Sequence, residues 1–354
     1  MEPVNVHDYE RLAEEGLEPG AFGYYAGGAG DEWTLAENLA AFRRWVLRPR
    51  VLVDVGSVTT ATTVLGTDVS MPILVAPTAF HRLAHPEGEQ ATARAAAAAG
   101  TIMCLSTLAT AGAAEVAEAA PGGARWYQLY WHPDRGLTRA IVEEAAASGF
   151  SAIVLTVDLP VLGNRERDLR TGFTLSDDLV PAFTRTASYT PEGGSEVLGW
   201  VVDPRLTWKD LEWLRSLSDL PLLVKGVLTA EDAALAVEHG CEGVVVSNHG
   251  GRQLDGVPAS LDALPEVVKA VGGRCEVLVD GGVRRGTDVA KALALGAQAV
   301  LVGRPVLWGL AHDGQAGVEH VLSLLRAETE LALALIGCPS PADVTRAHVA
   351  PAPR

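Results

Sequence analysis

The segment SNHGGRQLD, residues 247–255, places a possible proton acceptor next to a possible anion-binding group. The imidazole of His249 titrates near neutral pH, and Arg252, three residues later, can hold a carboxylate through two parallel hydrogen bonds. Asp158 is a candidate for orienting the imidazole and stabilising its charged form. For an acid with a hydroxyl group at C2, the arginine would fix the carboxylate while the histidine accepts a proton. A lone histidine of this kind is usually structural, but Arg252, Asp158 and Tyr130 together favour chemistry.

Two loops that contain glycine and arginine are candidates for a phosphate site. They read DGGVRRG, residues 280–286, and GRP, residues 303–305. Glycines let backbone N–H groups approach a phosphate, and arginines bind its oxygens in pairs. Sugar phosphates, pyridoxal phosphate and flavin mononucleotide (FMN) all suit this pattern. Lys225, in an apolar run, can form a Schiff base or hold a positive charge beside a flavin ring, and only the second use has support elsewhere in the chain.

Eight short runs rich in Val, Ile and Leu position these residues, and a helix-like stretch follows nearly every run. Strand then helix, repeated eight times, predicts an α/β protein with a closed (β/α)8 TIM barrel. The active site of such a barrel lies at the C-terminal ends of its strands, where these runs carry polar residues. The runs begin at Pro72, Thr101, Trp126, Ala152, Pro221, Gly243, Glu276 and Ala299. The polar residues at their ends include Gln128, Tyr130, Thr156, Asp158, Lys225, Ser247, Asn248, His249 and Asp280.

The spacing of the runs indicates one barrel domain with additions. The fourth and fifth runs begin 69 residues apart (221 minus 152), which exceeds the other intervals by roughly 40 residues and predicts an insertion at residues 163–206. We interpret this polar, glycine-containing insertion as a lid over the barrel mouth, with a plain surface loop as the alternative. Residues 1–70 are predicted to be an N-terminal extension with a helix at 7–16, residues 71–335 the barrel, and residues 336–354 a C-terminal tail.

Composition excludes several classes of partner. A formal net charge of -16 opposes binding to nucleic acids and to anionic membrane surfaces, so an anionic ligand must be bound by a local arginine cluster. The four cysteines are far apart and form no CxxC pair, which predicts neither a metal site nor disulfides. With no basic and apolar leader, no apolar stretch long enough to span a bilayer and no SKL-type ending, the sequence predicts a cytoplasmic protein.

SNHGGRQLD resembles the signature of the FMN-dependent 2-hydroxy acid oxidases and dehydrogenases, a family that includes glycolate oxidase, lactate oxidase, hydroxymandelate oxidase and mandelate dehydrogenase. The resemblance covers nearly all of residues 1–345 and includes YYAGGAGDEWTLAEN, MPILVAPTAFHRLAHPEGE, LTVDLPVLGNRERD, LVKGVLTAEDA and DGGVRRGTDVAKALALGA. It implies noncovalent FMN, oxidation of an (S)-2-hydroxy acid to the 2-oxo acid with O2 reduced to H2O2, and a homo-oligomer, either tetramer or octamer.

The resemblance assigns roles residue by residue. His249 matches the proton acceptor, Asp158 its carboxylate partner, and Arg165 and Arg252 the pair that holds the substrate carboxylate. The remaining substrate contacts are Tyr24, Tyr130, Leu108 and Leu162, of which Tyr130 is also expected to take part in catalysis. The flavin contacts are Pro77, Thr78, Ala79, Ser106, Gln128, Thr156, Lys225 and Ser247 around the ring, and Asp280, Gly281, Gly282, Arg284, Gly303 and Arg304 at the ribityl chain and phosphate.

One position departs from the family pattern. In LSTLAT, Leu108 stands where glycolate oxidases carry a tryptophan against the substrate. An isobutyl group in place of an indole enlarges an apolar pocket, where each buried methylene contributes about 0.8 kcal/mol. We therefore expect a substrate larger than glycolate: a medium-chain acid, an aromatic acid like mandelate, or lactate.

Three alternatives stay open at this point. A quinone-linked dehydrogenase would need a membrane-binding segment after the fourth strand, but the insertion there contains Asp177, Asp178, Glu192 and Glu196 and lacks a basic amphipathic face, which favours O2. A non-redox FMN barrel such as an isomerase is disfavoured by SNHGGRQLD, and a silent ligand-binding barrel by the complete catalytic set. His249 would take either the C2 proton or the hydroxyl proton, because both routes need the same base.

Overall fold

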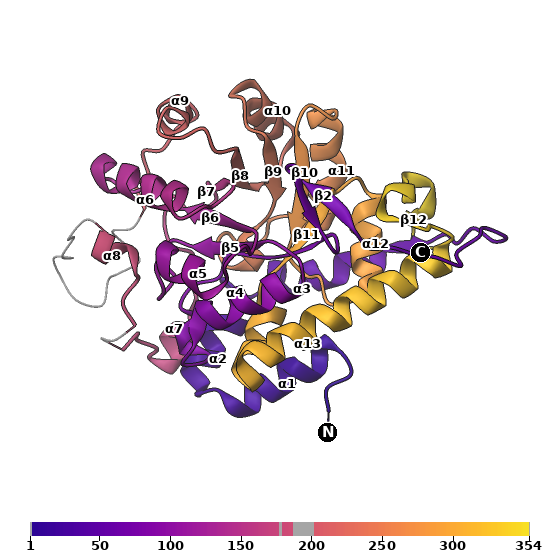
Figure 1. Ribbon diagram of the computed structural model, residues 1–354, viewed down its shortest axis with the longest axis horizontal. Coiled ribbons are helices and arrows are strands. Elements are labelled where there is room, and N and C mark those ends of the chain that lie inside the picture. The colour runs from indigo at the N-terminus through magenta and orange to yellow at the C-terminus, as the bar shows by residue number, and fades with distance from the viewer. Residues whose placement is uncertain (1, 177–178, 187–201, 354) are drawn as a thin grey trace.

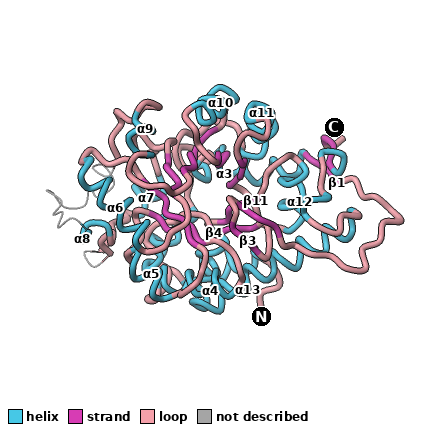
Figure 2. The backbone as a smooth tube through the Cα atoms, turned by 45° about the horizontal axis from the view of Figure 1, so that its top comes forward, coloured by secondary structure: helices cyan, strands magenta, loops and turns pink. Residues whose placement is uncertain are grey.

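The computed structural model describes residues 2–176, 179–186 and 202–353 (Figure 1). Eight parallel strands close into a barrel in the order β10-β11-β4-β5-β6-β7-β8-β9, so the last strand of the chain pairs with the first. Figure 2 shows the strands as an inner ring with helices outside. The predicted (β/α)8 barrel is confirmed, and each predicted run overlaps one strand. The strands are β4 (Ile73–Val75), β5 (Met103–Ser106), β6 (Arg125–Leu129), β7 (Ile153–Thr156), β8 (Leu222–Val227), β9 (Gly243–Val246), β10 (Glu276–Asp280) and β11 (Ala299–Val302).

Alternation along the strands explains why polar residues gather at one end of the barrel. One inward-facing residue of each strand belongs to a fully buried apolar cluster that fills the interior: Leu74, Cys104, Trp126, Val154, Leu223, Val245, Leu278 and Leu301. Side chains two positions further along face the same way. Those next residues are Ala76, Ser106, Gln128, Thr156, Lys225, Ser247, Asp280 and Gly303. The polar set therefore continues the inward rows at the C-terminal mouth.

The other end of the barrel is closed by a hairpin from the N-terminal extension. Strands β2 (Thr62–Val64) and β3 (Thr67–Val69) pair antiparallel, and Val64 and Val69 join the interior apolar cluster. This hairpin leaves only the C-terminal mouth for a ligand, so the barrel interior is a packed core rather than a channel.

Helices cover the outside of the barrel. Thr229 caps α10 by accepting a hydrogen bond from the N–H of Asp232, as its position predicts. Helix α13 (Arg304–Ile336) follows the last strand, and Asp313 and Gly314 interrupt its helical dihedral angles. The outer helices are α4 (Gly88–Ala98), α5 (Ala113–Ala119), α6 (Arg135–Ala147), α9 (Asp210–Arg215), α10 (Ala230–Glu238), α11 (Ser260–Val271), α12 (Gly286–Ala294) and α13 (Arg304–Ile336).

The N-terminal extension contacts both the mouth of the barrel and the end of the chain. It contains α1 (Val6–Gly16), α2 (Pro19–Ala26), α3 (Trp33–Ala40) and the 3-10 helix η1 (Ala41–Arg44). Helix α1 packs on α13, and the tail strand β12 (Val349–Pro351) pairs antiparallel with β1 (Trp45–Leu47). The sequence did not predict this pairing, since both strands are three residues long and nothing local links them.

The insertion after β7 begins with α7 (Glu166–Thr171), which packs on α2. An ion pair of 2.6 Å joins Arg167 to Glu32. A second short helix, α8 (Phe183–Thr186), follows. Much of the predicted lid, including Asp177, Asp178, Glu192 and Glu196, lies outside the described residues. Within the described ranges no helix has the length and apolar character to cross a bilayer.

Candidate active site

A single cavity at the C-terminal mouth collects most of the predicted site residues. It has a volume of about 130 Å³ and opens to solvent. The predicted residues that line it are Tyr24, Pro77, Thr78, Ala79, Ser106, Leu108, Tyr130, Leu162, Arg165, Lys225, His249, Arg252, Asp280, Gly281, Gly282, Arg284, Gly303 and Arg304. Four others do not line it: Gln128, Asp158 and Ser247 form hydrogen bonds to residues that do, and Thr156 accepts a hydrogen bond from Gln128.

His249 follows β9 in an unusual backbone conformation. Its φ angle is +59°, a left-handed value that costs energy for a residue with a β-carbon. The N–H of His249 donates to Ser247 Oγ at 3.0 Å, and the Asn248 side chain accepts from the N–H of Gly251 at 3.0 Å. These bonds hold the strained turn, which aims the imidazole into the cavity.

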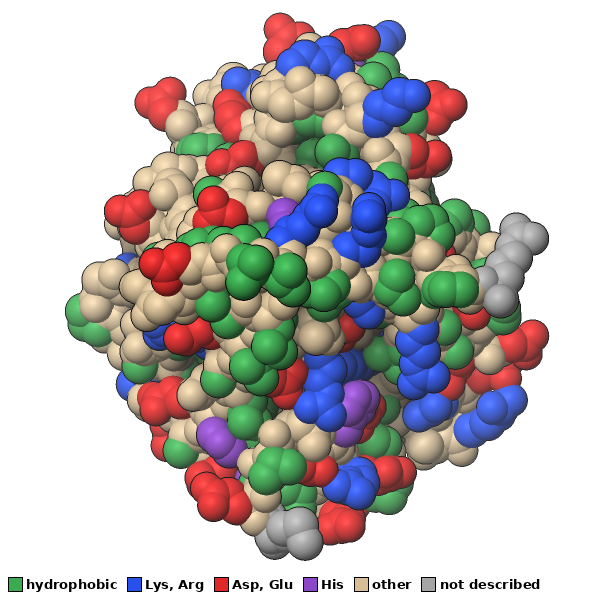
Figure 3. All heavy atoms as spheres, turned by 90° about the vertical axis from the view of Figure 1, so that its right-hand side faces the viewer, with side chains coloured by type: hydrophobic (Ala, Val, Ile, Leu, Met, Phe, Trp, Pro, Cys, Tyr) green, Lys and Arg blue, Asp and Glu red, His purple; other side chains and the backbone are tan. Residues whose placement is uncertain are grey.

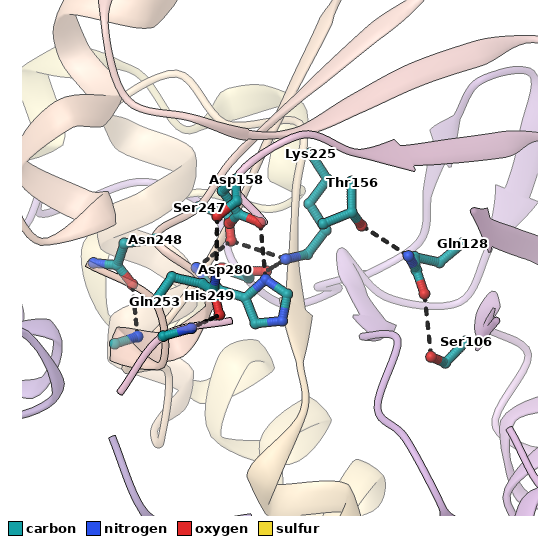
Figure 4. Close-up of polar contacts among 12 residues, drawn as sticks. Ser106, Gln128, Thr156, Asp158, Lys225, Ser247, Asn248, His249, Gln253 and Asp280 are labelled. Carbon is teal, nitrogen blue, oxygen red and sulfur yellow. Dashed lines mark hydrogen bonds and ion pairs between the residues drawn. The ribbon is translucent and has the colours of Figure 1, made fainter. Parts of the chain in front are cut away.

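Asp158, at the end of β7, fixes the orientation of this imidazole. Its Oδ1 atom lies 2.8 Å from Nδ1 of His249 (Figure 4). Glycine is required nearby, because a β-carbon on Gly226 would lie 2.5 Å from the β-carbon of Asp158. A carboxylate can only accept, so Nδ1 carries the hydrogen and Nε2 keeps its lone pair for the cavity.

The charges of this pair suit a proton acceptor. Burial lowers the pKa of His249 below its ordinary value, and the neighbouring carboxylate of Asp158 opposes that effect only in part. Burial would raise the pKa of Asp158, but the charge and hydrogen bond of His249 and the charge of Lys225 outweigh it and lower that pKa. A neutral imidazole beside an ionised carboxylate is therefore the resting state near pH 7.

Two arginines give the same cavity an anion site. One guanidinium nitrogen of Arg252 donates to the carbonyls of Tyr24 at 2.5 Å and Gly27 at 3.0 Å, and the group lies 5.0 Å from the Tyr24 ring centroid. Burial, and then the charge of Arg165, lower the pKa of Arg252 to about 10. Among the described residues, the buried Nε of Arg165 has no hydrogen-bond partner. A bound carboxylate would relieve both conditions.

Tyr130 is a candidate hydrogen-bond donor in this cavity. Burial raises its pKa to about 12, and the carboxylate of Asp158 adds to the shift. The phenol is therefore neutral at physiological pH and can donate its hydrogen to a substrate oxygen.

The wall expected to face the flavin ring carries two sets of polar side chains joined by hydrogen bonds or ion pairs (Figure 4). Lys225 donates to Ser247 Oγ at 3.0 Å and lies 3.1 Å from Asp280 Oδ2. Burial opposes the charge of Lys225, but Asp280 and Asp158 outweigh it and raise its pKa, so the ammonium persists. Gln128 accepts from Ser106 at 3.1 Å and donates to Thr156 at 2.9 Å.

The part of the cavity wall formed by Arg284 and Arg304 has the properties of a phosphate site. Burial lowers the pKa values of both Arg284 and Arg304, and the buried Nε of Arg284 has no partner among the described residues. Arg304 donates to the carbonyls of Tyr25, Gly27 and Gly250. Desolvated guanidinium groups that meet carbonyls rather than carboxylates still need an anion, which a phosphate supplies. The residues present therefore fit FMN.

Sequence reasoning missed several residues at this mouth. Tyr25 lines the cavity and donates to the Phe80 carbonyl at 2.6 Å, and its adjacency to Tyr24 was an available signal. Leu159 and Val202 also line the cavity. Leu159 directly follows Asp158 and was detectable, whereas Val202 lies at the far end of the insertion, where strand spacing gives no guide.

Known proteins resemble this chain over nearly its whole length. The family model for FMN-dependent dehydrogenase matches residues 13–351. An L-lactate oxidase from Nostoc sp. is 57% identical over 97% of this chain and 96% of that protein, and a glycolate oxidase from Spinacia oleracea is 51% identical over 99% and 96%. A crystal structure of mandelate oxidase with benzoyl-formic acid has a TM-score of 0.90 and 44% identity, covering 97% of both chains. The resemblance seen in the sequence is confirmed, and the chain belongs to the FMN-dependent dehydrogenase family of flavin oxidoreductases.

Proposed function

We propose that this protein oxidises an (S)-2-hydroxy acid to the 2-oxo acid and reduces O2 to H2O2. The observation that carries the proposal is that the oriented base His249 shares one cavity with two substrate-side arginines, Arg165 and Arg252, and with the FMN-compatible walls. The names of the relatives, lactate, glycolate and mandelate oxidase, support the same reaction.

Each side chain has a distinct task in this proposal. Arg165 and Arg252 hold the carboxylate, and Tyr130, with Tyr24, donates to substrate oxygen. The Nε2 atom of His249 takes a proton from the substrate, and Asp158 stabilises the imidazolium that forms. FMN, when bound, supplies the acceptor for the two electrons that leave the substrate. The substrate is thus fixed at its acid end while its hydroxyl-bearing carbon lies near the base.

We assign FMN to two parts of the cavity wall, one that contains Lys225 and one that contains Arg284 and Arg304. Pro77, Thr78 and Ala79 would contact the ring together with Lys225, whose retained positive charge would balance negative charge gained there. The other proposed ring contacts belong to the same wall and are joined to it by hydrogen bonds: Ser106, Gln128, Thr156 and Ser247. Arg284, Arg304 and the backbone of Gly281, Gly282 and Gly303 would hold the phosphate, with Asp280 near the ribityl hydroxyls.

Anaerobic spectroscopy tests the reaction directly. Glycolate, lactate, 2-hydroxyoctanoate and mandelate are mixed one at a time with the yellow holoenzyme, and we expect the flavin absorbance to bleach with at least one of them. Readmitted air should restore the colour with one H2O2 formed per 2-oxo acid. If none of the acids bleaches the flavin, the proposed oxidation is refuted. If an acid bleaches the flavin but air does not restore the colour, the electron acceptor is a compound other than O2, such as a quinone.

We also propose that the protein assembles as a homotetramer or octamer. The loop after β1 exposes Val51 at 81% and Leu52 at 103% of their surface, and Figure 3 shows the side from which it projects, with hydrophobic side chains gathered across its middle. Exposed apolar clusters of this kind are typical of subunit contacts. Light scattering of the wild type and of Leu52→Asp tests this, since a monomeric wild type contradicts it.

We also propose that the protein is cytoplasmic and folds as a single domain. The four cysteines are free thiols, which suits a reducing compartment. The contacts of α1 with α13 and of β1 with β12 tie the extension and the tail to the barrel, so we expect one cooperative calorimetric transition.

A further inference from the structure

A second cavity with an apolar wall adjoins the active-site cavity. Leu159 and Val202 line the active-site cavity, and the same two residues line a second cavity of about 220 Å³. The second cavity lies between the ends of β7 and β8 and the start of α9, and its apolar wall includes Val157, Pro160, Pro204, Leu206 and Leu211. The two cavities therefore share Leu159 and Val202 as apolar lining residues.

The two carboxylates that line the second cavity already have partners. Asp203 accepts from the Arg205 guanidinium at 2.7 and 3.0 Å, and Asp232 accepts from the Thr229 hydroxyl at 3.0 Å. These carboxylates would also repel an anion, whereas Arg165 and Arg252 attract one in the first cavity. An amphipathic acid would therefore place its carboxylate in the first cavity and its hydrocarbon chain in the second.

We propose that the side chain of the substrate passes between Leu159 and Val202 into this second cavity, so that unbranched medium-chain 2-hydroxy acids are the preferred substrate class. The inference rests on the proposed oxidation of 2-hydroxy acids. In this proposal a change between staggered rotamers of Leu159 or Val202 admits an alkyl chain, which is narrower than a phenyl ring. Each methylene buried beyond the two residues should raise kcat/KM about fourfold, so 2-hydroxyoctanoate should exceed lactate and mandelate.

A variant that fills the second cavity tests this inference. Leu206 lines the second cavity but not the active-site cavity, so Leu206→Trp should occupy the proposed chain site. We expect the ratio of kcat/KM for 2-hydroxyoctanoate to that for lactate to fall about tenfold or more. Leu331→Trp, at a residue 60% exposed on α13, is the matched control and should leave the ratio unchanged.

A second variant keeps the test decisive if Leu206→Trp does not fold. Leu159→Ala opens the boundary between the cavities and should raise the same ratio, because a chain then enters without displacing a side chain. An unchanged ratio in a yellow, lactate-active variant of either kind overturns the inference. Failure of the proposed function gives a different result, since lactate and 2-hydroxyoctanoate would then both leave the wild-type flavin unbleached.

Discussion

Nδ1 of His249 and Oδ1 of Asp158 lie 2.8 Å apart although 91 residues separate them in the chain. The barrel creates this contact by bringing the ends of β7 and β9 to one mouth on either side of β8. The bond fixes the tautomer of the imidazole and leaves Nε2 as the free base. Both the proton acceptor and its strength therefore depend on one pair of side chains that no local sequence pattern joins.

Replacing the base should stop turnover without releasing the cofactor. We expect His249→Ala to retain FMN, because the proposed cofactor contacts belong to other residues, and to lose about 100-fold to 10,000-fold in the rate of flavin reduction. Stopped-flow mixing with the best substrate measures that rate. Since position 249 has a left-handed backbone, His249→Asn is the better-tolerated companion variant, and His7→Ala is an exposed control. Near wild-type flavin reduction in either variant at 249 would falsify the assigned role.

Removing the partner carboxylate should change the pH profile. Burial lowers the pKa of His249 and Asp158 raises it, so Asp158→Asn should lower it further. In the proposed reaction flavin reduction requires the neutral imidazole, so its rate should fall as pH drops through this pKa. In the variant this acid limb should move to lower pH. The plateau rate should fall about 10- to 100-fold, as for lost outer partners of metal-bound histidines, because the imidazolium loses its counter-charge. An acid limb that stays in place would show that Asp158 does not act through His249.

Lys225 and Asp280 form a buried pair whose disruption has two separable effects. Their side chains are 6% and 10% exposed, so Lys225→Met leaves an uncompensated carboxylate and should destabilise the apoprotein by about 3 to 5 kcal/mol. Urea unfolding measures this loss. The double variant Lys225→Met/Asp280→Asn should recover most of the stability but still bind FMN weakly, because the cationic wall is absent. Wild-type FMN affinity in the double variant would remove Lys225 from the cofactor site.

The sequence predicts the barrel and much of its mouth because both depend on short-range patterns. The eight apolar runs are each followed by a helix, and the period of two places Ser106, Lys225 and Asp280 on the inward rows. The pairing of β1 with β12 was missed because it depends on long-range packing alone. Val202 was missed because it lies at the far end of the insertion, where strand spacing gives no guide.

The backbone of Leu108 is held in place where its side chain lines the active-site cavity. It is 4% exposed and lines the active-site cavity, its N–H donates to Ser106 Oγ at 3.1 Å, and its carbonyl accepts from the N–H of Phe80 at 3.1 Å. The backbone is thus held on both sides, and a larger side chain here must project into the cavity rather than displace the loop.

Leu108→Trp should therefore shift preference toward glycolate. The indole would occupy space available to a substrate side chain, while Arg165, Arg252, Tyr130 and His249 keep their contacts with the carboxylate and hydroxyl ends. The ratio of kcat/KM for 2-hydroxyoctanoate or mandelate to that for glycolate should fall tenfold or more, since excluding one or two methylenes is worth about 1 to 3 kcal/mol. Leu108→Met, which preserves volume, is the matched control and should change the ratio little. An unchanged ratio in an FMN-loaded Leu108→Trp enzyme would mean that the substrate side chain lies elsewhere, and the expectation of a substrate larger than glycolate would lose its basis at this position.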